Sequence, residues 1–309
     1  MATRIASGLV LGLALTTLPQ YTQWSAPTAL GWPVNTTGAE GAPFLTKDGL
    51  TLYYAGPGPD GSNDLLVSHR PTVDLPWGAP FGIPALNTPA NETNPQLSPD
   101  EHWLYFTTNI SGGLGGQDIW VSHRHDRKDN LGWEAPVNLG SSVNSSSNDI
   151  APTLFEDPAT GVITMYFASD RAGSLDIYAI TMRSDRTFAP ASPVAELNSS
   201  FADQGPAVRR DGLEIFIASN RPGTMGQTDL MVSTRATTGD AWSTPVFLGT
   251  PVNTPGFDQA PALSFDRHTL FYVSTGNLPG ATGPCSGPAG PCVSDIYFTT
   301  RQKVKDPND

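Results

Sequence analysis

The chain has 309 residues, a formal net charge of −12 and an isoelectric point near 4.7. This charge argues against binding to nucleic acid or to anionic membranes, because both need Lys and Arg to neutralise phosphate. Apolar residues make up 38% of the chain, and they occur in short runs that are bounded by turn-forming residues and lack a helical period. This pattern predicts an all-β fold.

Residues 1–20 are predicted to be a signal peptide. Arg4 is followed by an apolar run from Ile5 to Leu15, which is typical of a secretory signal and is too short to span a bilayer. The two cysteines, Cys285 and Cys292, lie in one Gly/Pro-rich loop and are expected to form a local disulfide. Together these features predict a secreted or periplasmic protein without membrane insertion.

Next in the chain is an outer-strand pattern from Trp24 to Val34, which has no partner strand beside it in the sequence. Three strands are then predicted at Ala42 to Thr46, Leu50 to Ala55 and Asp64 to Arg70, with an Asp-Gly turn after the first. A fourth, outer strand is predicted to begin at Trp77. These four strands form the first complete copy of a repeated unit.

The same order of strands recurs along the chain. In the four later copies the third strand reads DIWVSHR, DIYAITMR, DLMVSTR and DIYFTTR. Each copy is introduced by the spacing Asn-x4-acid-x2-Pro, in which Thr or Ser follows the Asn. The acids, 52, 57, 54 and 55 residues apart, are Glu40, Glu92, Asp149, Asp203 and Asp258. Five ordered matches at a near-constant period indicate a repeat architecture.

The last copy ends at Arg301 without an outer strand, whereas the segment from Trp24 supplies one. Joining the two gives five complete units and removes the exposed edges of an open sheet. The sequence therefore predicts a five-bladed β-propeller with four-stranded antiparallel blades, in which the N-terminal strand completes the last blade and closes the ring. Residues 21–309 are expected to form this single domain, as a monomer.

Segments such as SPDEHWLYFTTN, GGQDIWVSHR and RRDGLEIFIASNRPG resemble the WD40-like, TolB-type propeller repeat, which also occurs beside OmpA-type peptidoglycan-binding domains. The resemblance covers nearly all of the chain after residue 20. It implies a propeller that acts mostly as a protein-binding scaffold. The sequence lacks the N-terminal α/β domain of the best-known member and has no OmpA-type module, so the partner of that family cannot be transferred to this chain.

In a propeller, the Asn-x4-acid segment is the crossover from the outer strand of one blade to the inner strand of the next. The five acids are therefore expected beside the central channel, on the face that also carries the long loops between second and third strands. Function on β scaffolds concentrates in such loops. The predicted binding residues are Glu40, Glu92, Asp149, Asp203 and Asp258, together with Arg171 and Arg221.

Five neighbouring carboxylates would repel one another. At separations of roughly 7 Å and an effective dielectric constant of about 20, each pair costs about 2.4 kcal/mol. Turn N–H groups, the two arginines, solvent or a bound cation could offset this repulsion, and Ca²⁺ would suit such oxygen ligands best. Hydrogen bonding to turn N–H groups is the favoured interpretation.

The sequence favours a non-enzymatic binding scaffold whose acid-centred face meets an envelope or extracellular protein or a carbohydrate. The alternative is a glycoside hydrolase of the five-bladed arabinanase or invertase type, using Glu40, Glu92 and Asp149. Symmetry argues against catalysis, because catalytic acids need environments that differ. A lectin with one site per blade also stays open. The histidines are poor candidates for a metal site, because none belongs to a zinc-binding helix motif.

Overall fold

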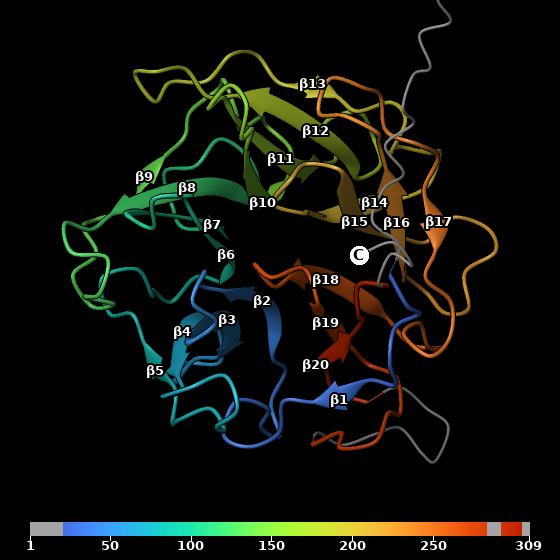
Figure 1. Cartoon of the computed structure of the whole chain (residues 1–309). Helices are drawn as coiled ribbons and strands as arrows, with labels where there is room; N and C mark the ends of the chain where they lie inside the picture. The colour runs from blue at the N-terminus through green and yellow to red at the C-terminus, as the bar shows by residue number, and fades with distance from the viewer. Residues whose placement is uncertain (1–20, 283–291, 305–309) are drawn as a thin grey trace, which may run out of the picture.

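The computed structural model describes residues 21–282 and 292–304, which fold into five sheets arranged around a central axis (Figure 1). Each sheet has four antiparallel strands. The innermost strands β2, β6, β10, β14 and β18 surround the axis, and the strands β5, β9, β13, β17 and β1 lie on the rim. The prediction of an all-β, five-bladed propeller is confirmed.

The strands follow the same order, from axis to rim, in every blade. Blade 1 contains β2 (Gly41–Leu45), β3 (Thr51–Pro57), β4 (Asn63–His69) and β5 (Phe81–Gly82). Blade 2 contains β6 (Glu92–Leu97), β7 (Trp103–Thr108), β8 (Asp118–His123) and β9 (Val137–Asn138). Blade 3 contains β10 (Asp149–Glu156), β11 (Ile163–Ser169), β12 (Asp176–Thr181) and β13 (Ser192–Pro193). Blade 4 contains β14 (Asp203–Val208), β15 (Glu214–Ser219), β16 (Asp229–Thr234) and β17 (Val246–Phe247). Blade 5 contains β18 (Asp258–Leu263), β19 (Thr269–Ser274), β20 (Asp295–Thr300) and β1 (Thr28–Ala29).

The ring is closed in blade 5, where β1 pairs with β20 in the register Thr28↔Phe298 and Ala29↔Tyr297. The ring of Trp24 also packs against the Arg301 guanidinium, 4.5 Å from its centre. Blades 1, 2 and 4 repeat this Arg–Trp stacking with residues of a single repeat. The N-terminal segment thus takes the place of an ordinary fourth strand, as predicted from the sequence.

The rim strands are shorter than predicted, at two residues each. Trp77 does not open the rim strand of blade 1, because β5 begins four residues later at Phe81. The tryptophan instead precedes the strand and is buried by its contact with Arg70. The Trp ring therefore holds the first part of this segment together with two hydrogen bonds of Gly78, whose N–H donates to the carbonyl of His69 and whose carbonyl accepts from the hydroxyl of Ser68.

The hydrophobic core consists of five clusters, one between each pair of neighbouring blades. The second strand of a blade is packed on both faces, and all six residues of β15 are buried. This explains why these strands read as continuous apolar runs instead of an alternating pattern. Because each cluster draws on two blades, no blade has a core of its own.

Every inner strand contains a β-bulge. In blade 3 the pairing of β10 with β11 skips between Ile150 and Thr153, and the other four blades skip at the equivalent place. The first skipped residue has a positive φ of 48–58° at Ala42, Asn94, Ala151, Gly205 and Ala260. The second is the Pro of the repeated motif, which has no N–H to offer and suits a position without a ladder partner.

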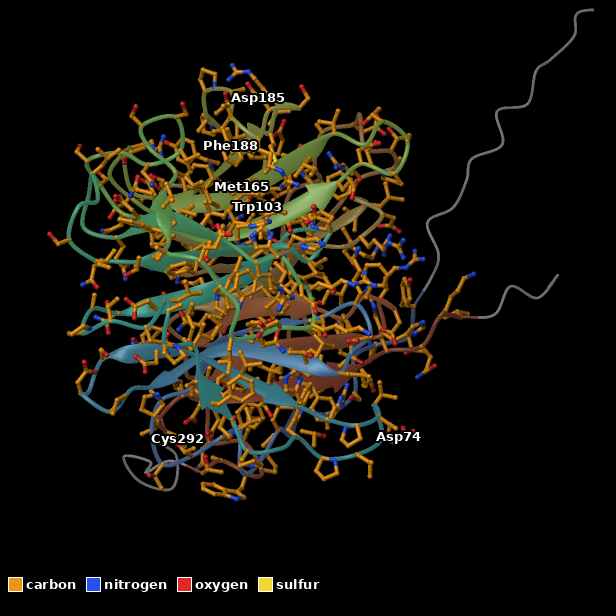
Figure 2. All side chains as sticks on the ribbon, turned by 90° about the vertical axis from the view of Figure 1, so that its left-hand side faces the viewer. Asp74, Trp103, Met165, Asp185, Phe188 and Cys292 are labelled. Atoms are coloured by element: carbon orange, nitrogen blue, oxygen red, sulfur yellow. The ribbon has the colours of Figure 1, made fainter. Side chains whose placement is uncertain are left out.

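The two faces of the disc carry different connections. The crossover face carries the links from the rim strand of one blade to the inner strand of the next and the loops between second and third strands. The turn face carries the other two connections of each blade. In Figure 2, Cys292 lies on the crossover face and Asp74 on the opposite turn face. Nothing in the described chain forms a helix long and apolar enough to cross a membrane.

Candidate functional site

The Asn of each motif lies in the crossover that leaves one blade, and its side chain bonds the third strand of the blade that the crossover leaves. In blade 2, the Asn144 side chain donates to the carbonyl of Ile119 at 2.9 Å and accepts from its N–H at 2.9 Å. The other four asparagines make the same two-way contact, with Asn35 bonding Ile296, Asn87 bonding Leu65, Asn198 bonding Ile177 and Asn253 bonding Leu230. Each side-chain amide therefore satisfies the backbone N–H and the carbonyl of one third-strand residue, which lies beyond the end of the short rim strand.

The Thr or Ser after each Asn binds the acid of the motif. Its backbone N–H and its hydroxyl both donate to the carboxylate, in the pairs Thr36–Glu40, Thr88–Glu92, Ser145–Asp149, Ser199–Asp203 and Thr254–Asp258. All five acids are buried, with at most 1% of their surface exposed. The favoured interpretation from the sequence, that turn N–H groups hold the acids, describes this geometry.

The five acids do not share one environment. Asp149 forms an ion pair with Arg171, and Asp203 forms an ion pair with Arg221. Each arginine also donates to a backbone carbonyl of the crossover, that of Val143 at 2.6 Å for Arg171. Blades 3 and 4 therefore neutralise their buried carboxylates with a fixed cation, a strong charge-assisted arrangement.

The acids of the three remaining, contiguous blades have no such arginine. Burial raises the pKa of Glu40 and of Glu92 above the ordinary value, against hydrogen bonds from Thr36 and Thr88 that lower it. Burial likewise raises the pKa of Asp258 to about 6. These three carboxyl groups can hold a proton under conditions in which an exposed carboxyl group is ionised.

Each of these three acids also lies near a second carboxyl group, the Asp that opens the third strand of the preceding blade. Repulsion from Asp295 adds to the raised pKa of Glu40, and repulsion from Asp229 adds to that of Asp258. Pairs of carboxyl groups in unequal environments are what acid–base chemistry on glycosides requires. The symmetry of the sequence motif therefore does not extend to its chemistry.

A cavity of about 270 Å³ opens at the crossover end of the channel. Of the five motif acids, Glu40 contributes to its wall, beside small residues at the bulges. The remaining polar side chains of the wall are amides and hydroxyls, from Asn63, Thr93, Asn94, Gln204, Gln259 and Ser294. A protonatable carboxyl group among neutral hydrogen-bonding side chains is suited to a polyhydroxylated ligand.

A larger cavity of about 390 Å³ lies at the turn end of the channel, on the far side of the bulges. Its lining combines apolar residues, among them Phe44 and Leu263, with polar residues such as Gln96, Thr153 and Arg210. The turn sequences do not indicate how far the channel extends below the bulges, so the sequence pointed to the crossover face alone.

The structure places Glu40, Glu92, Asp149, Asp203 and Asp258 in one ring and brings Arg171 and Arg221 to two of them. Their role in binding stays a prediction. Among the described residues, no three of these acids come close enough to form a set of metal ligands, so the ring carries no observation in favour of Ca²⁺. The predicted disulfide also stays a prediction, because Cys285 lies outside the described residues, as does the predicted signal peptide.

A sequence signal for the unequal acids was available. Arg171 and Arg221 follow the second strand by two residues in blades 3 and 4. The equivalent positions in the other blades hold Gly58, Ile110 and Gly276. Comparing this position across the repeats separates the two ion-paired acids from the other three.

No protein-family model matches the chain, and no curated protein matches its sequence. Solved structures do resemble it in fold. A thermostable family-43 glycoside hydrolase is 16% identical with a TM-score of 0.60, covering 89% of this chain and 93% of that chain. An α-L-arabinofuranosidase from Lactobacillus brevis is 18% identical with a TM-score of 0.56, covering 86% and 92%. The native Bacillus subtilis arabinanase Arb43A is 12% identical with a TM-score of 0.57, covering 88% and 96%.

These comparisons correct the functional preference drawn from the sequence. The expectation of a non-enzymatic binding scaffold is wrong as the first choice, because the similar solved structures are glycoside hydrolases. The symmetry argument against an enzyme also fails, because the five acids have unequal partners. The propeller implied by the resemblance to the TolB-type repeat is present, whereas membership of that family stays a prediction.

Proposed function

We propose that this protein is a glycoside hydrolase whose active site is the crossover-face cavity around Glu40. The observation that carries the proposal is a buried carboxyl group of raised pKa in the wall of a cavity on the propeller axis, which also presents amide and hydroxyl side chains. Hydrolysis of a glycoside needs one carboxyl group that is protonated at the working pH and a second that is ionised. The likeness to arabinanase and arabinofuranosidase structures makes arabinose-containing glycans the substrates to test first.

In this proposal Glu40 donates its proton to the glycosidic oxygen as the bond from that oxygen to the anomeric carbon breaks. The second carboxyl group is Glu92 or Asp258, on the two neighbouring blades, each of which is ionised at a pH above its raised pKa. As its carboxylate, it accepts a proton from water while the water oxygen bonds to the anomeric carbon. The amide side chains of Gln204 and Gln259 hold the sugar hydroxyls. Asp149, which sequence analysis grouped with Glu40 and Glu92, stays paired with Arg171 and takes no part in proton transfer.

Export from the cytoplasm would suit this function, because a polysaccharide substrate lies outside the cell. The predicted signal peptide supports such a location. The repeat that resembles TolB supports the same compartment, and in this proposal it supplies the scaffold of the enzyme. A carbohydrate is accordingly the proposed partner.

Activity should be measured as the release of reducing sugar from arabinan and arabinoxylan and of nitrophenol from aryl pentosides. Replacing the proposed acid in Glu40→Gln should lower kcat by about 10²–10⁴-fold, the usual contribution of a general acid. Glu92→Gln and Asp258→Asn identify the second carboxyl group, because the correct one should show a comparable loss. Asp203→Asn is the matched control: it changes the same motif position in blade 4 and should keep kcat at a temperature where it stays folded.

Two outcomes contradict the proposal. The wild-type protein could release no product from any of these substrates. Alternatively, Glu40→Gln could retain full activity, which would place any catalysis outside this cavity.

A further inference from the structure

A group of three metal-binding side chains lies on the turn face of blade 2, away from both cavities. His123 is the last residue of β8, and His125 follows it by two residues. The rings of the two histidines lie beside each other, with their centroids 5.0 Å apart. Glu134 comes from the segment that returns toward β9, beside Trp133. The backbone N–H of Glu134 donates to the carbonyl of His123 at 2.9 Å, so the three residues are close neighbours.

The residue between the two histidines fixes this segment. Arg124 is 1% exposed and points into the molecule. Its Nε donates to the carbonyl of Glu101 at 3.0 Å, and one Nη donates to the hydroxyl of Tyr53 at 2.9 Å. Its guanidinium also lies 4.5 Å from the ring centre of Trp133, with which it forms a β-bridge. These contacts of Arg124 hold the backbone between the two histidines against the body of blade 2 and against Tyr53 of blade 1.

The returning segment and the ring of His123 are held as well. The hydroxyl of Ser122 donates to the carbonyl of Glu134 at 2.6 Å. The ring of His123 packs on that of Trp103, which is labelled in Figure 2, with centroids 4.5 Å apart. Supporting contacts of this kind orient metal ligands and strengthen a site.

The three side chains converge on one point. Glu134 Oε1 lies 3.3 Å from His123 Nδ1 and 3.1 Å from His125 Nε2. All three ligand atoms lie within 4.8 Å of one another. Two ligand atoms that each lie about 2.1 Å from a tetrahedral zinc ion are about 3.4 Å apart. The observed separations from the carboxylate are close to this value, so a small shift would admit an ion.

We propose that His123, His125 and Glu134 bind one divalent transition-metal ion, with zinc as the expected occupant. Two imidazoles and one carboxylate suit Zn²⁺, Co²⁺ and Ni²⁺, whereas Ca²⁺ and Mg²⁺ prefer oxygen ligands alone. The side chain of His125 is 88% exposed, so the fourth ligand comes from solvent or from a molecule bound there. The three side chains are the one such group among the described parts of the chain. The histidines were poor metal candidates in the sequence because none belongs to a helical zinc motif. This group instead combines the last residue of β8 with the loop that follows it.

Without a metal, the same contacts would be hydrogen bonds from the imidazole N–H groups to the carboxylate. A titration of the metal-stripped protein with Co²⁺, followed by its visible absorption, and with Zn²⁺, followed by calorimetry, separates the two cases. We expect one equivalent to bind and acidification to release it, because protons compete with the metal ion for imidazole ligands. Loss of a ligand in His125→Ala or Glu134→Gln should weaken binding by more than about tenfold, since loss of even a supporting partner costs 10–100-fold.

The chain supplies a matched control. His69 ends β4 as His123 ends β8, but Arg70 and Pro71 follow it, so blade 1 has no second histidine. His69→Ala should bind Co²⁺ and Zn²⁺ like the wild type. Absence of saturable binding overturns the proposal, and so does binding that His125→Ala leaves unchanged. Because both readouts are independent of hydrolysis, failure of the proposed enzymatic function would not affect this result.

Discussion

A chain that lacks residues 24–35 is expected not to fold cooperatively. The deletion removes β1 and leaves β20 as an unpaired edge. It also removes Trp24 from Arg301 and takes away Asn35, whose side chain satisfies both the N–H and the carbonyl of Ile296 at 3.0 Å. Because every hydrophobic cluster spans two blades, the damage in blade 5 reaches both of its neighbours. The expected loss exceeds about 5 kcal/mol, the lower end of the total stability of a domain.

The measurement is thermal unfolding followed by circular dichroism, with gel filtration to detect expanded or aggregated chains. Trp32→Ala lies within the deleted segment and serves as the control, because Trp32 is 79% exposed and should be replaceable with little effect. A synthetic peptide of residues 24–35 should restore part of the cooperative transition when it is added to the truncated chain. A truncated chain that melts like the full chain would show that closure through β1 contributes little.

Asp258→Asn is expected to stabilise the protein at pH 8. The pKa of Asp258 rises from 3.8 to about 6 on folding, chiefly because of burial. Because the pKa is higher in the folded chain, folding is accompanied by proton uptake at pH values between 3.8 and about 6. Stability is therefore highest below the unfolded pKa, decreases as the pH rises from about 4 to about 6, and stays lower above that range. A difference of about two pKa units corresponds to about 3 kcal/mol.

The asparagine avoids this penalty because it carries no charge, and its side-chain oxygen can still accept from Thr254. The gain should be largest at pH 8 and should vanish near pH 4, as measured by denaturant unfolding at both pH values. Asp203→Asn is the informative comparison, because it leaves the partly buried Arg221 without its carboxylate and should destabilise the protein. Equal effects of the two substitutions at pH 8 would contradict the division of the ring into paired and unpaired acids.

The two stability experiments also bear on the proposed activity. If Asp258 is the second carboxyl group of the reaction, its replacement should raise stability and lower kcat together. Active sites often hold charged groups in positions that weaken the fold. If Asp258 has a purely structural role, its replacement by asparagine should raise stability and leave kcat unchanged.

The sequence was most informative where a contact recurs in every blade. The Asn of the motif bonds a third strand, and the Thr or Ser after it binds the acid, so both are required five times and the period becomes visible. The unpaired segment at Trp24 likewise predicted how the ring closes, because a blade without a fourth strand exposes an edge. The Pro of the motif was visible too, although its position at a bulge was not, since a bulge depends on the register between two strands.

The site was harder to predict because it depends on what differs between blades. Arg171 and Arg221 were noted as possible partners of the acids, yet only the structure shows that they serve Asp149 and Asp203 alone among the five. The proximity of Glu134 to His125 arises from the fold of a loop, and no spacing in the sequence encodes it. Repetition in a sequence thus reveals the scaffold, whereas chemistry is found where the repetition breaks down.

The kinks of the five inner strands lie where the two cavities of the channel meet. A residue of positive φ and a proline occur there in every blade, and the five residues of positive φ line both cavities. Side chains on either side of these kinks can therefore change without altering the number of blades. A scaffold of this kind could acquire a new substrate through a few replacements around its mouth, while the framework that encloses the channel stays as it is.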